Sequence, residues 1–548
     1  MRLDRHNSLL ILLISLLIAA LACGQAASTQ GSAQSPTTIA AATGSAQPAP
    51  ADSAGSEPAL AGNPILIGTE YIIIEAPWRV SPLADLLEPL GLTAAKPLPE
   101  NFAWGKMQSS PEADLDFTNL DNFVNQFQSQ GIETLVLGLR SLNDWASKDV
   151  RVEGALFPLK GGIKEEYLDE YEAWVTAIVE RYDGDGVSDL PGLKAPIRYY
   201  EVGVEFSSYE PEPVEEYLQI LELSYRAAHA AYPDVLIAHV AFLATPALFE
   251  TLAPSEYESA FALLEDQTHP LGDMRAVLDR PDLFDVLNIH SLGHPYEIEA
   301  IVAWLNYETG QRGYQKPVMI SDTGSTPFIA WGPATICDRP QNQMGRLVLP
   351  ATEADRCRLA DYFTRLVGAD IATLQWTREF IAKDTVKRVV VAAEQGVVLI
   401  NTAFTEDLLL LKLGLAQAGA GTAAWAGLVD FDKKELRPVF YALQQLIAEM
   451  DSYTRISRVL FEDPGVRLYE LEKEGQPAWI AWYDPGKLYL PDDSLPQTTL
   501  QFDFGAAKVT VSEIAIAAGG AVSQVIEAVD GVVSITLGYS PVFISIGG

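Results

Sequence analysis

The sequence predicts an α/β fold, namely a (β/α)8 barrel followed by a C-terminal all-β, sandwich-like domain. From residue 64 to about 451, short apolar segments alternate with amphipathic segments of helical period. Eight apolar segments occur in that stretch, which is the number of strands that a closed parallel barrel needs. After residue 451 the hydrophobic period becomes two and turn residues are frequent, which is typical of antiparallel strands.

The barrel prediction depends on the order of its elements. The segments with helical period place their apolar residues three or four apart, so each has one face for a core. Strands separated by such helices form right-handed parallel crossovers. An open, doubly wound sheet is the alternative, but no glycine-rich phosphate turn follows the first strand. The expected strands are 65–74, 92–97, 133–140, 197–204, 235–243, 285–290, 317–321 and 397–404, and the clearest helices are 164–182, 213–234, 376–394 and 437–450.

The C-terminal region, residues 452–548, contains four stretches that alternate apolar and polar side chains. They cover 466–486, 498–505, 508–516 and 532–547. Strands of this length, joined by short turns, predict a small sandwich that packs on the barrel.

The N-terminus has the pattern of an export signal. Arg2 and Arg5 precede a 13-residue apolar run, Leu9 to Leu21, which is too short for a permanent membrane span. Cys23 ends a motif that resembles a bacterial lipoprotein box, so residues 1–23 are expected to be a signal peptide and Cys23 the lipidated residue. A plain signal peptide or an uncleaved anchor is the alternative. The polar residues 24–63 are predicted to form a disordered tether.

These features predict an exported, membrane-anchored lipoprotein at the cell surface or in the periplasm, whose contact with the membrane is made by the lipid anchor. The formal net charge of −36 argues against nucleic acid and anionic lipid surfaces as partners, and an acidic surface without meaning for any partner is the favoured interpretation. With Cys23 lipidated, Cys337 and Cys357 are left as an even pair in an oxidising compartment, and we expect them to form a disulfide.

Polar residues are concentrated at the predicted C-terminal ends of the strands, where barrels place their reactive groups. Glu205 follows the fourth strand and Asp322 the seventh, so two carboxyl groups are expected near the barrel mouth. The other candidates at strand ends, assigned to substrate binding, are Lys96, Glu201, His290 and His294. For Glu201, a structural role inside the barrel is favoured over a catalytic one.

Several stretches resemble clan A glycoside hydrolases. They are "RYYEVGVEFSSYEPEP", "YPDVLIAHVAF", "DVLNIHSLGHP", "KPVMISDTG" and "GLVDFDKKELRPVFYALQQL", in the order of that template over residues 64 to about 451. The resemblance implies a retaining-type glycosidase without a cofactor, acting on the O-glycosidic bonds of an oligo- or polysaccharide. Glu205 matches the acid/base, and Asp322 takes the position of the nucleophile. In a retaining enzyme one carboxyl protonates the leaving oxygen while the other attacks the anomeric carbon.

The chain departs from that family at three positions. Val204 replaces the asparagine that contacts the sugar 2-hydroxyl, and Phe206 replaces a proline. Asp322 replaces a glutamate, so its carboxyl is shorter by roughly one C–C bond, ~1.5 Å. A barrel that binds glycan without cleaving it is therefore the second hypothesis.

Other motifs support weaker predictions. "DTGS" at 322–325 is typical of aspartic proteases, but those need two such loops and the chain has one. "DGDGVSD" at 183–189 favours an acidic turn over a calcium loop. For His290 and His294, hydrogen bonding to a sugar is favoured over zinc, so no metal site is predicted. Trp104 and Trp145 are candidate stacking platforms for pyranose rings.

Overall fold

The computed structural model describes residues 64–546, apart from 153–156, 208, 246, 263–268, 325–328, 331–336, 338–345, 408–424 and 474. The predicted signal peptide, the lipidation site Cys23 and the tether 24–63 therefore lie outside the described residues. Among those that are described, no helix is both long and apolar enough to cross a membrane.

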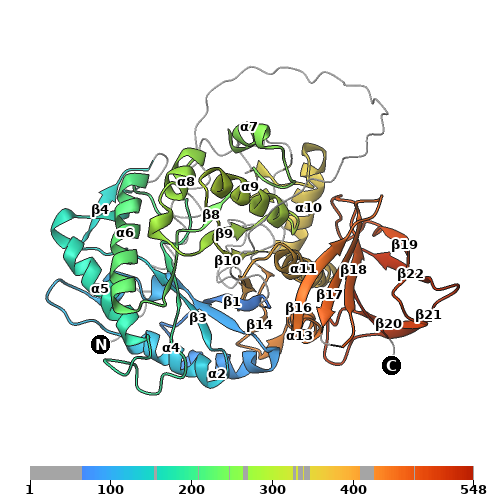
Figure 1. Cartoon of the computed structure of the whole chain (residues 1–548), viewed down its shortest axis with the longest axis horizontal. Coiled ribbons are helices and arrows are strands. Elements are labelled where there is room, and N and C mark those ends of the chain that lie inside the picture. The colour runs from blue at the N-terminus through green and yellow to red at the C-terminus, as the bar shows by residue number, and fades with distance from the viewer. Residues whose placement is uncertain are drawn as a thin grey trace.

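A parallel sheet forms the centre of the N-terminal part of the chain (Figure 1). Its order is β7-β6-β3-β2-β1-β13-β10-β9-β8. The terminal strands β7 and β8 are two pieces of one segment, and Ala238 also bridges to Val286, so the sheet closes into an eight-stranded barrel. The strands are β1 (Leu66–Ile72), β2 (Ala94–Pro97), β3 (Thr134–Leu139), β6 (Tyr199–Val202), β7 (Leu236–Ala238), β8 (Phe242–Leu243), β9 (Leu287–Ser291), β10 (Val318–Thr323) and β13 (Leu399–Phe404). All eight predicted strands are present, which confirms the barrel.

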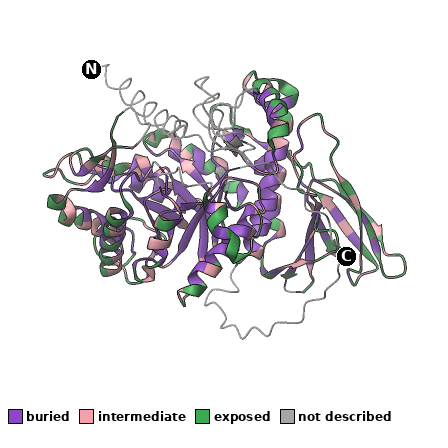
Figure 2. Cartoon of the chain, turned by 90° about the horizontal axis from the view of Figure 1, so that it is seen from above, coloured by how far each residue is buried: buried purple, intermediate pink, exposed green. Residues whose placement is uncertain are grey.

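Helices surround the barrel and cover the outer face of its strands (Figures 1 and 2). Helix α5 shows why they form: Tyr171, Trp174, Val175, Ile178 and Val179 lie on one face, and all are buried. The described helices of eight or more residues are α2 (Pro77–Leu87), α4 (Thr118–Ser129), α5 (Leu168–Arg181), α6 (Val214–Ala231), α8 (Leu271–Leu278), α9 (Glu297–Gln311), α10 (Arg356–Val367), α11 (Ile371–Glu394) and α13 (Pro438–Glu449).

In the described part of the barrel region, three two-stranded antiparallel sheets lie outside the main sheet and were not predicted. They pair β4 (Ser147–Val150) with β5 (Leu159–Ile163), β11 (Ile329–Ala330) with β12 (Arg346–Leu347), and β14 (Val429–Asp430) with β15 (Glu435–Leu436). Each is too short to show a period-two pattern in the sequence, so periodicity could not reveal them.

The C-terminal part is antiparallel. A six-stranded sheet has the order β16 (Tyr453–Val459), β17 (Val466–Lys473), β18 (Ala478–Tyr483), β23 (Val542–Ile546), β20 (Lys508–Glu513) and β21 (Ser523–Glu527). A second pair, β19 (Gln497–Phe502) with β22 (Val533–Gly538), packs its Leu500 and Ile535 against Leu468 and Trp479 of the larger sheet. The predicted sandwich-like domain is confirmed.

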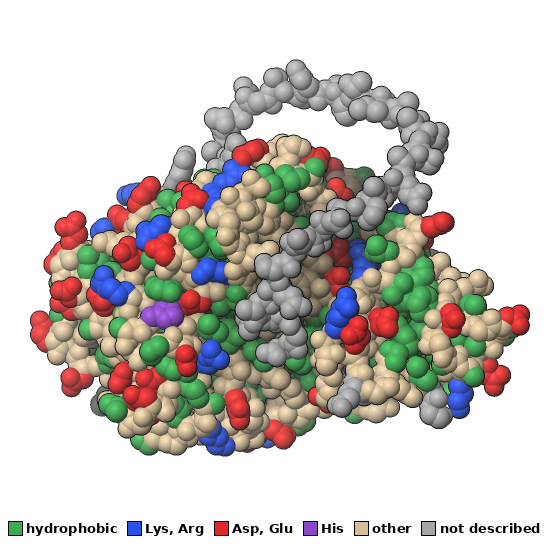
Figure 3. Space-filling view, viewed as in Figure 1, with side chains coloured by type: hydrophobic (Ala, Val, Ile, Leu, Met, Phe, Trp, Pro, Cys, Tyr) green, Lys and Arg blue, Asp and Glu red, His purple; other side chains and the backbone are tan. Residues whose placement is uncertain are grey.

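The opposite face of the six-stranded sheet packs on the barrel beside α11 and α13 (Figure 1). Tyr469, Trp482 and Phe543 of this face belong to the same hydrophobic core cluster as Val390 of α11 and Leu443 of α13. One continuous core therefore joins the two parts. On the face shown in Figure 3, acidic side chains are scattered rather than gathered into one patch.

The barrel interior is built in layers by the period-two alternation of its strands. The lower layer is apolar and includes Ala94, Val136, Ala238, Met319 and Leu399. Two residues further along the strands the layer becomes polar, with Lys96 on β2, Glu201 on β6, Asn288 on β9, Ser321 on β10 and Asn401 on β13. Gly68 of β1 supplies the space for this layer, because a Cβ atom there would collide with the Asn401 side chain.

Candidate active site

The polar layer is a hydrogen-bond network below the barrel mouth. Glu201 is its centre: its Oε2 lies 2.7 Å from Lys96 Nζ, and its Oε1 accepts from Asn288 Nδ2 at 2.8 Å and from Ser321 Oγ at 2.9 Å. Asn401 donates to the backbone carbonyl of Ser321 at 3.2 Å. Every one of these side chains is buried, so the network holds the strand ends in a fixed arrangement rather than contacting solvent.

Glu205 is joined to this network through His290. Glu205 follows β6, where it bridges to Ala241, and its Oε2 lies 2.8 Å from His290 Nδ1. On the other side of the ring, His290 Nε2 lies 3.1 Å from Ser321 Oγ. Ser321 uses its one hydroxyl proton toward Glu201, so Nε2 of His290 must be the donor to Ser321.

This direction of hydrogen bonding means that Glu205 and His290 share one proton. Because Nε2 carries a proton, the contact between Nδ1 and Glu205 contains a further proton, either on the carboxyl or on the imidazolium. Burial alone would lower the pKa of His290, but the hydrogen bond to Glu205 and the charges of Asp322 and Glu205 outweigh it and raise that pKa. The pair therefore stores a proton at the barrel mouth.

Asp322 lies on β10, the seventh barrel strand, and is half-buried. The pairing of β10 with β9 shifts register between Ile320 and Asp322. In a regular strand, Ser321 and Asp322 would point to opposite faces. The irregularity allows both side chains to lie at the barrel mouth. Ser321 is hydrogen-bonded to His290. Asp322 interacts with Glu70, and its charge acts on His290.

Glu70 is a site residue that the sequence reasoning missed. It lies on β1, where pairing with both neighbouring strands shifts register at or after Thr69, and the next residue, Tyr71, has φ of 62°. Left-handed backbone at a tyrosine is costly and is found where the surroundings impose it. Alternation from Gly68 would have placed Glu70 inside the barrel, and this signal was available in "LIGTEYI".

Lys96 and Glu201 were predicted to bind substrate, and the structure corrects this. Both side chains are almost fully buried in their ion pair, with exposures of 3% and 0%. They shape the charge below the site and do not present free groups to a ligand. Lys96 contacts Glu201 at 2.7 Å and Glu70 at 3.6 Å.

Trp104 is not an exposed sugar platform, contrary to the prediction. It is fully buried and packs against Trp145 and Trp174, with ring centroids 4.9 and 6.3 Å away. Trp145 is half-buried and packs on Tyr167 at 5.0 Å, while its Nε1 donates to the carbonyl of Gln108. The spacing of these tryptophans near strand ends reflected an aromatic core cluster.

His294 lies on the loop after β9 and does not join the Glu205 contacts. Its Nδ1 accepts from the backbone of Tyr296 at 3.1 Å, and burial together with nearby Arg388 and Arg467 lowers its pKa to about 4. A neutral imidazole with one nitrogen occupied is part of the loop structure. The loop is held by Arg388, which donates to the Ser291 carbonyl at 3.0 Å and also contacts the Gly293 carbonyl.

The disulfide predicted between Cys337 and Cys357 is not formed. The two residues are neighbours, but the Cys357 thiol donates to the backbone carbonyl of Cys337 at 3.5 Å. The disulfide was expected from an even pair of cysteines behind an export signal, and that reasoning fixes neither the separation of the two residues nor the direction of their side chains.

The acidic turn 183–189 satisfies its carboxylates internally. Asp189 accepts from the backbone of Gly184 and Gly186, and Asp183 from that of Asp185. Together these three aspartates are the one group of possible metal ligands found among the described residues. The pattern agrees with the predicted turn, and it leaves the absence of a metal as a prediction.

A second acidic cluster lies on the loop after β6 and was not predicted. Glu210 accepts from the backbone of Val204 at 2.8 Å and lies near Arg140 and Glu212. Burial, followed by the charge of Glu212, raises the pKa of Glu210 to about 8. The hydrogen bond from the backbone of Val204 fixes the residue that precedes Glu205, so the cluster stabilises the position of Glu205.

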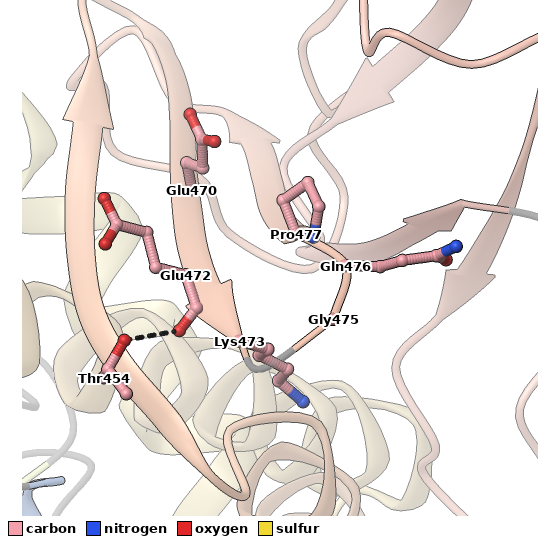
Figure 4. Close-up of a pocket in the computed structure, with 7 residues that line it drawn as sticks. All are labelled: Thr454, Glu470, Glu472, Lys473, Gly475, Gln476 and Pro477. Atoms are coloured by element: carbon pink, nitrogen blue, oxygen red, sulfur yellow. Dashed lines mark hydrogen bonds between the residues drawn. The ribbon is translucent and has the colours of Figure 1, made fainter.

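A concavity lies on the C-terminal sheet, between β16, β17 and the turn that follows β17 (Figure 4). Its volume is about 570 Å³, and its lining residues are Thr454, Glu470, Glu472, Lys473, Gly475, Gln476 and Pro477. None of these is aromatic, so the concavity lacks the ring that usually stacks on a sugar face.

Of the comparisons with known proteins, the one with solved structures supports the fold. No protein-family model matches the chain, and no curated protein matches it. A family 39 glycoside hydrolase from the gut symbiont Bacteroides cellulosilyticus WH2 matches with a TM-score of 0.55 and 12% identity, over 88% of this chain and 81% of that chain. A glucosidase from Croceicoccus marinus matches with a TM-score of 0.50 and 13% identity, over 89% and 98%. The chain thus has a glycoside hydrolase-like TIM barrel with a β domain, and the predicted resemblance to clan A is confirmed for the fold.

Proposed function

We propose that the protein is a glycoside hydrolase that cleaves O-glycosidic bonds of an oligo- or polysaccharide. The observation that carries this proposal is the position of Glu205 and Asp322 at the ends of the fourth and seventh strands of a closed barrel. His290 is hydrogen-bonded to Glu205, and the charge of Asp322 acts on the His290 ring. Two carboxyl groups with different surroundings are what glycoside hydrolysis requires.

In this proposal Glu205 is the acid. The proton held between Glu205 and His290 passes to the glycosidic oxygen as the bond to the anomeric carbon breaks. Asp322, ionised, either attacks that carbon or takes a proton from the water that does. In the first case Glu205 then removes a proton from the water that releases the sugar, and His290 receives it back.

The test is hydrolysis of a panel of aryl glycosides by the purified protein beside Glu205→Gln and Asp322→Asn. Both variants keep the side-chain volume and lose the ionisable group, and each should lower turnover by about 10²- to 10⁴-fold. Product anomers, read by NMR in the first seconds, distinguish a retaining from an inverting reaction. Equal turnover by all three proteins would refute the proposal.

A specific observation supports binding without cleavage as the second candidate. Val204 offers no side-chain donor where the resembling family has an asparagine. The buried amides of Asn288 and Asn401 do not replace it, because they donate to Glu201 and to the Ser321 carbonyl. Oligosaccharide binding measured by calorimetry, without turnover on any substrate, would favour this candidate.

The proposal includes an extracytoplasmic location with lipid on Cys23, supported by the charged start and short apolar run of residues 1–23. Metabolic labelling with radioactive palmitate should mark the protein and leave Cys23→Ser unlabelled. Label retained in that variant, or release of the unmodified protein into the medium, would contradict the anchor.

A further inference from the structure

Glu70 lies among buried carboxyl groups that outnumber the cations near them in the described part of the chain. Glu70, Glu201 and Asp322 act on one another there, and Lys96 is the cation that pairs with them, at 2.7 Å from Glu201 and 3.6 Å from Glu70. Glu70 and Glu201 are buried. Three ionised carboxyl groups beside one ammonium in a buried space would repel each other strongly.

Two buried carboxyl oxygen atoms without a hydrogen-bond donor in the described part of the chain show which carboxyl group carries a proton. Glu70 Oε1 and Asp322 Oδ1 are both buried, and no donor among the described residues reaches either of them. The two carboxyl groups nevertheless lie within hydrogen-bonding reach of each other. If both were ionised, two acceptors would face one another; a single proton turns that contact into a hydrogen bond.

We propose that Glu70 is a positioning residue for Asp322: its carboxyl is protonated and donates the hydrogen bond that holds the Asp322 carboxylate in place. The inference rests on the proposed role of Asp322 in glycoside hydrolysis. The register shifts at Glu70 and Asp322 and the left-handed Tyr71 support it, because such irregularities re-aim side chains at functional sites.

The surroundings of Glu70 agree with a protonated carboxyl. Burial raises the pKa of Glu70 well above its ordinary value, the charge of Asp322 raises it further, Lys96 opposes, and Glu201 adds to the rise. Thr405, directly after the neighbouring strand β13, donates its hydroxyl and its backbone N–H to the Glu70 carbonyl and carries no charge. Asp322 also interacts with His290, but the pair of His290 and Glu205 holds one shared proton and has no net charge. Among the described residues the net positive charge that acts on these carboxyl groups is therefore that of Lys96, which is not enough to keep both Glu70 and Asp322 ionised beside Glu201.

The first test measures the proton without using catalysis. A carboxyl whose pKa is raised by folding stabilises the fold at low pH, and that contribution is lost as pH rises through the raised value. Urea unfolding midpoints are compared for the purified wild-type protein and Glu70→Gln from about pH 5 to about pH 8. The wild-type midpoint should fall relative to the variant as pH rises, because glutamine cannot ionise.

The same comparison in the Asp322→Asn background isolates the shared proton. Without the Asp322 charge, the gap in midpoint that Glu70→Gln produces should shrink at high pH. Glu210→Gln is the matched control, since Glu210 is another buried carboxyl with a raised pKa, and its gap should not respond to Asp322→Asn. A gap at Glu70 that is absent, or equally large in both backgrounds, overturns the proposal.

The second test uses the pH profile of kcat/KM. Glu70→Gln keeps a donor for Asp322 and should keep the acid limb of the profile, whereas Glu70→Leu removes the donor and should move that limb to higher pH. A purely structural role would lower the rate in both variants without moving the limb. If no glycoside is hydrolysed, the proposed function fails, while the unfolding measurement still decides whether the proton is shared.

Discussion

The Nδ1 atom of His290 lies 2.8 Å from the Oε2 atom of Glu205, and the far side of the ring is bound to Ser321. The acid of the proposed reaction therefore does not stand alone. Its proton belongs to a pair whose second member is fixed by the polar layer of the barrel, and this relation determines how the activity should depend on pH.

Replacing His290 with glutamine should move the alkaline limb of the pH profile to lower pH. In the wild type the pair keeps its proton until the pH passes the raised pKa of His290. Glutamine cannot hold that proton, and its amide would stabilise ionised Glu205. We expect kcat/KM at neutral pH to fall by about 10- to 100-fold. Steady-state rates across the pH range check this, and an unshifted limb would show that His290 only packs.

Replacing Lys96 with methionine should destabilise the protein by about 3–5 kcal/mol near neutral pH, because Glu201 would be buried without its counter-ion. Lys96→Arg keeps the positive charge and serves as the control, so its loss should be much smaller. Unfolding free energies in urea measure both. If the methionine variant were as stable as the wild type, the polar layer would not depend on this ion pair.

The barrel could be predicted because its signal is long and repeated. Eight apolar segments such as 133–140 and 285–290 alternate with helices like that at 168–181, and the order survives errors of a few residues at each boundary. The positions of Glu205 and Asp322 at strand ends follow directly from that order. What the pattern could not provide is the direction of each side chain where a strand departs from regular pairing.

Asp322 and Glu70 illustrate that limit. Strict alternation from Ser321 places Asp322 outside the barrel, and only the register shift in β10 returns it to the mouth. The left-handed φ of Tyr71 likewise leaves no mark in the sequence, since it is imposed by packing. The prediction that Trp104 is a stacking platform was wrong for a related reason, because nearness to a strand end does not distinguish an exposed ring from one in the core.

Replacing Trp104 with alanine should cost about 3–5 kcal/mol of unfolding free energy, as expected for a fully buried ring. In the proposed reaction KM should stay the same at temperatures where the variant is folded, because the buried ring is not available to a ligand. Trp78, which is 72% exposed, is the matched control and its alanine variant should change stability by less than about 0.5 kcal/mol. A raised KM in the Trp104 variant would restore the platform assignment.

The contact between barrel and β domain includes a buried ion pair that should determine the acid stability of the protein. Lys387 Nζ lies 2.9 Å from Asp484 Oδ2, which also accepts from the Tyr296 hydroxyl at 2.9 Å. Burial opposes ionisation of Asp484, but the Lys387 ammonium and these hydrogen bonds outweigh it and lower its pKa. Its stabilising contribution is therefore present above the ordinary aspartate value of about 3.9 and is lost as pH falls through the lowered pKa.

Replacing Asp484 with asparagine leaves the fully buried Lys387 without a counter-ion and should destabilise the protein by about 3–5 kcal/mol at neutral pH. The loss should shrink at very low pH, where the wild-type carboxyl is itself protonated. Glu472→Gln, which breaks the exposed pair with Arg455, should cost less than about 1 kcal/mol. Urea unfolding at several pH values measures all three proteins. Tyr296 lies just beyond the loop that follows β9, the strand that carries His290. An Asp484→Asn variant that lost stability and also moved the alkaline limb of kcat/KM would therefore show that the β domain acts on the proposed acid.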